Sequence, residues 1–156
     1  MEKLNINDLN IMTKEEVVNL GIEFTDDICY SGQYGDQVFD KPMEEGGAAI
    51  TGILYEKNPN DTLAYYSFYE NGIPHGVTVE FYQNGKVREH KYMEKGTITG
   101  RSISWFDSGK IKSVIDYKYG FRLHSREWDE NGNLIKVKQE PTAFEKEMIT
   151  KYDLEA

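Results

Sequence analysis

Glycine recurs at a fixed interval through the middle of the chain, and this interval limits the folds that the chain can adopt. Three series of glycines run through residues 46–138: Gly52, Gly76 and Gly100; Gly72, Gly96 and Gly120; Gly85, Gly109 and Gly132. Within each series the spacing is 24 residues, except that Gly132 follows Gly109 by 23. A fixed period of this length indicates a repeat protein in which each unit packs mainly on its neighbours.

Each unit has the pattern of a β-hairpin. Val77, Val79 and Phe81 alternate with polar residues, which is the two-residue period of a half-buried strand. Asn84–Gly85 is typical of a type I′ turn. The return strand opens on an apolar residue, and the residue six positions later is expected on the same face: Leu63 with Tyr69, Val87 with Met93, Ile111 with Tyr117. The predicted fold class is mainly β, an antiparallel β-hairpin meander with a short N-terminal α/β segment and a C-terminal helix.

The array is rich in aromatic side chains, and two interpretations are open. In the first, these side chains form the core of a thin sheet, because each can bury about 150–250 Å². In the second, some of them form a binding face of the kind found at protein interfaces. Tyr82, Phe106 and Trp128 are the candidates for exposed anchors.

The N-terminal region carries a helix signal. Thr13 followed by Glu16 is a capping box, and Gly21 stands just past an apolar stretch, so a short helix is predicted from Lys14 to Leu20. The segments KLNIN before it and IEFTDDICY after it are candidate strands. The helix is expected to cap the sheet, because an open sheet needs its terminal strands covered or blunted.

The C-terminal region carries a second capping signal, Thr142 followed by Glu145. Phe144, Met148 and Tyr152 fall on one face of a helix, so the chain is expected to close with a helix of about ten residues that also caps the sheet. The predicted organisation is an acidic N-terminal α/β cap over residues 1–45, a repeat array over 46–140 and a C-terminal helix over 141–156.

Acidic residues are concentrated at the two ends of the chain. The net charge of −9 divides into −8 for residues 1–51, +2 for residues 52–138 and −3 for residues 139–156. An acidic segment repels nucleic acid and membrane phosphates and attracts basic proteins, although solubility alone also explains such a charge. The candidate partner-binding carboxylates are Asp26, Asp27, Asp36, Asp40, Glu44 and Glu45.

The sequence holds no pattern typical of catalysis or of a metal site. His75, His90 and His124 have no metal-ligand spacing. Cys29 is the single cysteine, which excludes an internal disulfide, and it is expected to be a buried thiol. Adjacent carboxylates on a strand point to opposite faces, although a pair formed across two strands is left open. We therefore predict a non-enzymatic protein without a cofactor or a metal.

The ends of the sequence also bear on location. The N-terminus has no basic region followed by an apolar run, which a signal peptide needs. No apolar stretch reaches the roughly 18 to 20 residues of a membrane span. A cytoplasmic location is expected.

The repeat resembles the MORN-repeat variant and, more closely, the YwqK-type antitoxin family, in which lines containing TGI-x-Y-E, Y-x-x-G-x-x-H-G and Y-x-N-G-K follow one another. The matching residues are Thr51, Gly52, Ile53, Tyr55, Glu56, Tyr69, Gly72, His75, Gly76, Glu80, Phe81, Tyr82, Asn84, Gly85 and Lys86. Residues 1–45 carry none of the pattern. Arg122 and His124 depart from it, so the last unit is expected to end the array.

This resemblance implies a function. Such antitoxins or immunity proteins are encoded beside secreted toxins, often nucleases or deaminases, and protect the producing cell. The chain is accordingly expected to neutralise a basic cognate toxin by direct binding and to be a monomer when free, with neither nucleic acid nor membrane as a partner. The alternative is a MORN-repeat scaffold for protein assembly. The repeat body's charge of +2 is too small for electrostatic lipid binding.

Overall fold

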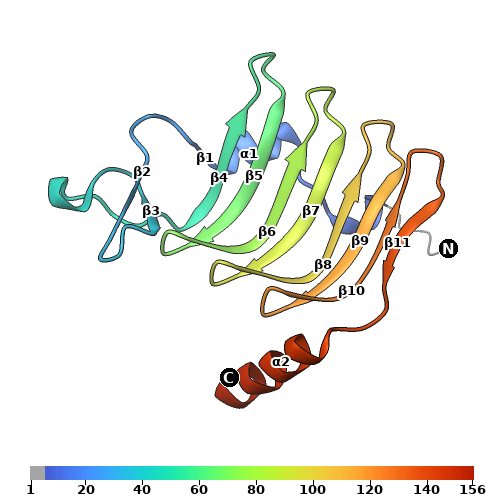
Figure 1. Ribbon diagram of the computed structural model, residues 1–156. Helices are drawn as coiled ribbons and strands as arrows, with labels where there is room; N and C mark the ends of the chain where they lie inside the picture. Colours follow the sequence, from blue (N-terminus) through green and yellow to red (C-terminus); the bar gives the residue numbers. More distant parts are fainter. Residues whose placement is uncertain (1–5) are drawn as a thin grey trace.

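One twisted sheet forms the centre of the computed structural model, which describes residues 6–156 (Figure 1). Within that range nine strands lie in the order β1-β4-β5-β6-β7-β8-β9-β10-β11. Only β1 and β4 are parallel. The bounds are β1 Ile22–Glu23, β4 Gly52–Lys57, β5 Leu63–Glu70, β6 Ile73–Phe81, β7 Val87–Glu94, β8 Thr97–Trp105, β9 Ile111–Lys118, β10 Phe121–Trp128 and β11 Leu134–Lys138. The predicted meander of hairpins is confirmed. The type I′ turn expected at Asn84–Gly85 is wrong, because such a turn needs a positive φ at both residues and only Gly85 has one, at +88°.

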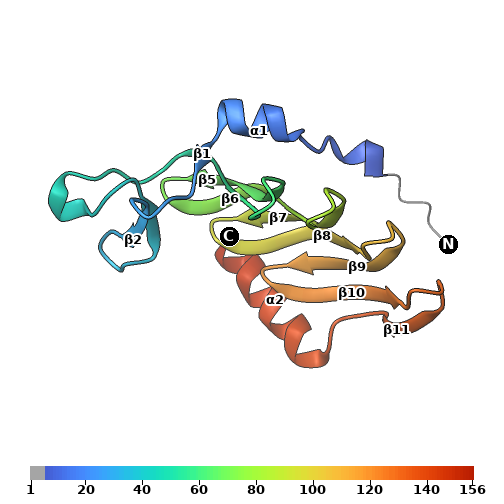
Figure 2. The same cartoon turned by 90° about the horizontal axis from the view of Figure 1, so that it is seen from above.

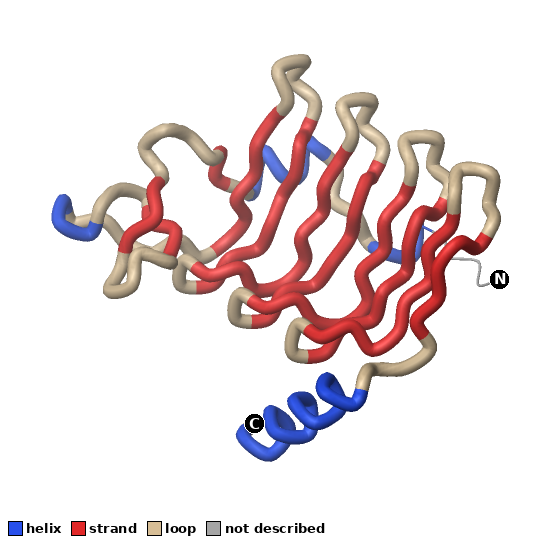
Figure 3. The backbone as a smooth tube through the Cα atoms, in the orientation of Figure 1, coloured by secondary structure: helices blue, strands red, loops and turns tan. Residues whose placement is uncertain are grey.

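The turns between successive hairpins are tied to the preceding unit by one repeated hydrogen bond. The turn glycine has a positive φ and donates its amide to a carbonyl oxygen, in the pairs Gly72–Ile50 (2.7 Å), Gly96–Pro74 (2.9 Å) and Gly120–Ile98 (3.2 Å). Donors and acceptors both recur every 24 residues. Figure 3 shows these turns gathered at one end of the sheet and the hairpin turns at the other. The 24-residue period of the sequence is therefore the period of this turn and its hydrogen bond.

The two faces of the sheet can be read from residues that face each other across neighbouring strands, since such residues point to the same side. One row crosses β4 to β11 through Tyr55, Tyr66, Val79, His90, Ile103, Val114, Arg126 and Val137. We call it the covered row, because six of its members are buried and the N-terminal segment packs on the same core. The hydrophobic core thus lies on one face.

The N-terminal segment forms η1 (Ile6–Leu9) and α1 (Lys14–Leu20) and lies across the covered face (Figure 2). The predicted capping box is confirmed, with hydrogen bonds in both directions between Thr13 and Glu16. Val17 is fully buried against the sheet core, and the Met12 amide donates to the Tyr66 hydroxyl at 3.0 Å. The helix therefore caps the sheet as expected.

His90 occupies a position in the covered row where the neighbouring repeats have Tyr66 and Val114. Its side chain is 1% exposed, and neither ring nitrogen has a hydrogen-bond partner among the described residues. Burial lowers the pKa of His90. A buried, unpartnered imidazole costs free energy, and its protonation costs more.

We predict that His90→Leu makes the protein less sensitive to acid. The pKa of His90 is lower in the folded state than in the unfolded state, so the unfolded chain binds the extra proton as the pH falls below about 6.5. Wild-type stability should then fall relative to the variant by at most about 1.4 kcal/mol per pH unit, and above pH 6.5 this difference should be constant. Urea midpoints at about pH 5 and pH 8 measure it; parallel losses in the two proteins would contradict the prediction.

The region before the array forms a small lobe beside the sheet, which we call the acidic lobe (residues 24–49). It contains β2 (Cys29–Ser31), β3 (Gln37–Phe39) and η2 (Met43–Glu45). Of the candidate strand IEFTDDICY, only the two ends are strands, in β1 and β2. The candidate strand KLNIN lies partly outside the described residues, and from Ile6 the chain forms η1 instead.

Neither predicted domain boundary is tested by the fold, and the division stays a prediction. α1 and β1 nevertheless join the main sheet and its core. Cys29 is a free thiol that is half-buried rather than buried.

The C-terminal helix α2 (Ala143–Glu155) is thirteen residues long, slightly longer than predicted, and it starts with the expected capping box. It lies along the end of the sheet formed by the inter-hairpin turns (Figure 1). Tyr152 packs on Tyr119 at 5.4 Å between ring centroids, and Asp153 accepts a hydrogen bond from the Tyr119 hydroxyl at 2.7 Å. Phe144 is 64% exposed, so the predicted apolar face is only partly used. Among residues 6–156, no helix combines the length and apolarity needed to cross a membrane.

Candidate functional site

The second face of the sheet carries a row of facing residues that none of the helices in residues 6–156 covers. The row runs through Glu56, Tyr65, Glu80, Glu89, Ser104, Ser113, Glu127 and Lys136. We call it the open row, and its side of the sheet the open face. Polar and charged residues predominate on it, as expected for the solvated side of an antiparallel sheet.

Two carboxyl groups of the open row face each other directly, Glu80 on β6 and Glu89 on β7. Their side chains are 27% and 30% exposed. Arg88 lies 3.2 Å from Glu80, and Lys91 lies 4.0 Å from Glu89. Burial by itself would raise the pKa of Glu80, but the hydrogen bond with Glu89 and the charges of Lys91 and Arg88 lower it overall. Burial and the same hydrogen bond raise the pKa of Glu89.

A pocket of about 360 Å³ lies beside this carboxyl pair. Small hydroxyl side chains line its floor: Ser102 is 5% exposed, and the hydroxyl oxygens of Ser104 and Ser113 are 2.5 Å apart. Ser102 also donates to Glu89 at 3.5 Å. The larger side chains around it come from the strands and hairpin turns alone: Tyr82, Arg88, Trp105, Lys112, Ile115, Tyr117 and Arg122. The serines leave a notch in the middle of the open face.

Each return strand contains one extra residue that shifts the register of its hairpin. The extra residues are Ala64, Arg88, Lys112 and Ile135, which follow the repeat spacing. The shift places Leu63 in the core of the covered face and Tyr69 on the open face. The expectation that the first residue of a return strand and the residue six positions later share a face is wrong, because the bulge between them reverses the alternation of the two faces.

The bulges set two cations over aromatic rings. Arg88 lies 6.0 Å from the ring centre of Tyr82, and Lys112 lies 5.6 Å from that of Phe106. Both rings are half-buried, and the Tyr82 hydroxyl donates to the carbonyl oxygen of Trp105 at 2.7 Å. These two candidates keep an accessible edge.

Trp128 does not lie on the surface. Its side chain is 7% exposed and belongs to a core cluster with Ile103, Trp105 and Val114. The expectation that Trp128 is an exposed anchor is wrong, because its position on β10 points to the face that the N-terminal segment covers.

The acidic lobe gathers most of the predicted carboxylates. Asp26, Asp27, Asp40 and Glu45 line one open pocket of about 590 Å³ together with Cys29, Lys41 and Pro42. Glu44 is exposed in η2 beside them, and Asp36 is exposed in the turn between β2 and β3. Lys41 is the single Lys or Arg in residues 24–49, so the lobe projects a concentrated negative charge.

The lobe is held to the sheet by backbone hydrogen bonds. The Val38 amide donates to the Gly72 carbonyl at 2.8 Å, and the Ile50 amide donates to Val38 at 2.9 Å. The Gln37 side chain donates to the Asn71 carbonyl at 2.8 Å. Ile28, Val38, Ile50 and Leu54 form a separate buried cluster beneath it. The carboxylates therefore stand on an anchored support rather than on a free loop.

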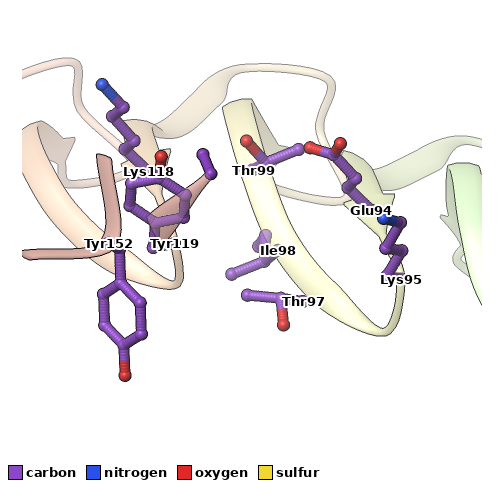
Figure 4. Close-up of a pocket in the computed structure, with 9 residues that line it drawn as sticks. Glu94, Lys95, Thr97, Ile98, Thr99, Lys118, Tyr119 and Tyr152 are labelled. Carbon is purple, nitrogen blue, oxygen red and sulfur yellow. The ribbon is translucent and has the colours of Figure 1, made fainter. Parts of the chain in front are cut away.

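Another pocket, of about 550 Å³, lies between α2 and the sheet (Figure 4). Thr97, Ile98 and Thr99 line it from β8, and Tyr119 and Tyr152 line it from the last inter-hairpin turn and from α2. Neither a histidine nor a cysteine is among its lining residues in the described chain. We assign it no catalytic role.

The histidines do not converge on a reaction centre. His75 accepts from the Lys95 amide at 3.1 Å, and His124 lies 3.0 Å from Asp116, which also binds Arg101. Burial would raise the pKa of Asp116, but its hydrogen bonds to Arg101 and His124 lower it overall. Within residues 6–156 no group of three or more His, Cys, Asp or Glu side chains could hold a metal ion.

Sequence reasoning missed the facing carboxyls and two exposed tyrosines of the lobe. Glu80 and Glu89 are nine residues apart in the sequence and lie on either side of the hairpin turn at Asn84–Gly85. That turn indicates that the two strands pair, but the bulge at Arg88 decides that these two glutamates face each other. Tyr30 and Tyr34 are 66% and 81% exposed, and their place beside acidic residues was the available signal.

Comparison with known proteins finds relatives of the repeats and of most of the chain. Residues 74–95 and 98–119 each match the family described as MORN repeat variant, and the two matches are offset by 24 residues. The chain is 38% identical over 115 residues to a protein of Bacillus subtilis (strain 168) that is named immunity protein YwqK, over 74% of this chain and 73% of the relative. No solved structure shows a significant match.

Proposed function

This chain belongs to the MORN-repeat family of immunity protein YwqK, and from that premise we propose that it binds a cognate toxin directly and neutralises it without catalysis. The observation that carries the proposal is the anchored acidic lobe at one end of an uncovered sheet face. A non-enzymatic role also agrees with a repeat that presents a surface rather than an enclosed reaction centre.

The partner is proposed to be basic and to act in the cytoplasm of the producing cell. A nuclease or a nucleic-acid deaminase needs a basic groove to hold phosphates, and an acidic protein can occupy or flank that groove. Opposite potentials on the two surfaces accelerate encounter. Tyr82 and Phe106 are proposed as partial anchors at the end of the open face where the hairpin turns lie.

Co-expression tests the proposal. The probe is a candidate toxin domain taken from the neighbouring genes, expressed with and without the chain. We expect growth arrest by the toxin alone and rescue by the chain. Killing that is equal in both cultures would overturn the antitoxin function.

Charge reversal in the lobe should slow association with the toxin. We expect Asp26→Lys, Asp27→Lys, Glu44→Lys and Glu45→Lys together to lower the association rate at low salt by about tenfold or more and to flatten its salt dependence. A matched control reverses the same number of exposed carboxylates away from the lobe and from the open face: Asp8, Glu15, Glu147 and Glu155. Stopped-flow association at several salt concentrations measures both variants, and equal rates would contradict the steering role.

The assembly scaffold is the second candidate, and one observation favours it. The terminal strand β11 exposes Leu134, Ile135 and Val137 at 52%, 64% and 48%. An exposed apolar edge strand is a template for pairing with another chain. Co-expression separates the two functions, because a scaffold would bind a partner without rescuing growth.

A further inference from the structure

The notch of the open face has more cations around it than the neighbouring carboxylates can balance. Each carboxylate of the open row beside the notch lies within 4.0 Å of a lysine or arginine nitrogen. The pairs are Glu80–Arg88 at 3.2 Å, Glu89–Lys91 at 4.0 Å and Glu127–Lys136 at 3.9 Å. Lys112 and Arg122 also line the notch, and within residues 6–156 neither has a carboxylate partner. These two cations are an excess of positive charge.

The hairpin turns beside the notch reduce this excess without cancelling it. The charged residues of the three nearest turns are Lys86, Asp107, Lys110, Asp129 and Glu130. Two lysines against three carboxylates leave one net negative charge. The Asp129 carboxylate also accepts hydrogen bonds from the amides of Asn131 and Asn133 in its own turn, so it is already engaged.

Lys112 and Arg122 come to the notch from opposite ends of the strands. Lys112 follows a hairpin turn as the bulge residue of β9, and its nitrogen lies 5.6 Å from the centre of the Phe106 ring. Arg122 follows an inter-hairpin turn at the start of β10, where it faces Tyr117. Both cations are exposed, so a partner can reach them. An anion that enters the notch would therefore lie between them.

The floor of the notch supplies a hydrogen-bond donor. The hydroxyl groups of Ser104 and Ser113 share one hydrogen bond of 2.5 Å, which uses one of their two protons. The other proton has no further acceptor among the described residues and can be donated into the notch. Ser113 is 9% exposed, so the donor stands at the base of a recess rather than on a flat surface. A donor between two cations suits an anion.

The charge pattern of the face favours a single carboxylate over a chain of phosphates. A nucleic acid strand lying along the sheet would also meet Glu80, Glu89 and the acidic lobe, which repel it. An aspartate or glutamate side chain carries one charge at its tip and needs only the notch of about 360 Å³. The planar guanidinium of Arg122 can bind both oxygens of such a carboxylate. The fitting partner is therefore a protein.

We propose that the notch receives an aspartate or glutamate side chain of the toxin, with Lys112 and Arg122 as its ion-pair partners and a serine hydroxyl of the floor as a hydrogen-bond donor. This inference rests on the proposed function and adds the orientation of the complex. The acidic lobe meets the basic surface of the toxin, and the notch meets an acidic group beside that surface. Two sites of opposite charge fix the direction in which the toxin lies along the sheet.

The test removes both charges with Lys112→Gln and Arg122→Gln in one variant. Because neither cation has a carboxylate partner in the free protein, we expect the melting temperature to stay close to that of the wild type. Because losing a desolvated ion pair speeds dissociation, we expect the toxin domain, inactivated by substitution, to dissociate about tenfold faster or more, with little change in the association rate. Surface plasmon resonance measures both rates.

The control is Lys146→Gln with Lys151→Gln, which removes two exposed lysines of α2 outside the open face and changes the net charge equally. It should dissociate as the wild type does. The inference is overturned if the Lys112/Arg122 variant dissociates at the wild-type rate, or if the control dissociates as fast as that variant, because the effect would then be one of net charge alone.

A single-stranded oligonucleotide is the second probe. We expect it not to bind the wild type. Binding that the Lys112/Arg122 variant loses would assign the notch to nucleic acid and overturn the inference. If the wild-type chain does not bind the toxin domain at all, the proposed function itself is overturned, and this contact with it.

Discussion

Replacing Trp128 with alanine is expected to lower the free energy of unfolding by about 3–5 kcal/mol, the range for deleting a large buried aromatic side chain. Trp128 is 7% exposed and packs in the cluster of Ile103, Trp105 and Val114. Ile6 and Leu9 of η1 pack against the same cluster, so its loss should also loosen the N-terminal segment. Urea denaturation followed by circular dichroism measures the change.

Phe106→Ala is the comparison for this variant. Phe106 is half-buried at the edge of the open face, so its loss should cost only about 1 kcal/mol. We expect Phe106→Ala to weaken toxin binding, and Trp128→Ala to leave binding unchanged under conditions in which it is folded. Unchanged stability of Trp128→Ala combined with weakened binding would show that Trp128 acts as a surface anchor after all.

Replacing Gly72 with alanine is expected to cost about 3 kcal/mol or more and to release the acidic lobe. The residue has φ +77°, and a Cβ there would lie 2.9 Å from the Cβ of Gln37 and from both the amide nitrogen and the carbonyl oxygen of Val38. Backbone atoms cannot move aside as a flexible side chain can, so the hydrogen bond from Val38 to Gly72 should break. Amide exchange at Val38 and urea denaturation measure the effect.

Gly109→Ala is the matched control for Gly72→Ala. Gly109 also has a positive φ, +91°, but no atom lies within 4 Å of a Cβ placed there. The substitution should therefore cost only the left-handed backbone penalty of about 1–2 kcal/mol. Equal losses at the two positions would contradict the role of Gly72 as the anchor of the lobe. The toxin association rate should fall for Gly72→Ala alone, because only this variant displaces the steering carboxylates.

Much of the fold was predictable because it depends on neighbouring residues. Asn84–Gly85 favours a hairpin turn, and Thr13 with Glu16 favours a helix start, through contacts that span only a few positions. For the candidate site, the sequence predicted only that the surface is negatively charged. Asp26 and Asp40 were expected to contribute to one acidic surface, and they line one pocket. The spacing of Asp26 and Asp40 did not indicate which other residues would lie beside them.

The sequence by itself determined the repeating hairpins, the two capped helices and the acidic ends of the chain, because alternation, turn chemistry and charge are local properties. Only the tertiary structure decided which face would be covered, since alternation separates two faces without saying which one another segment will bury. That choice buried Trp128 and left Glu80 partly exposed. The bulge at Arg88 then set the register that opposes Glu80 to Glu89, and a one-residue shift of register changes which side chains meet.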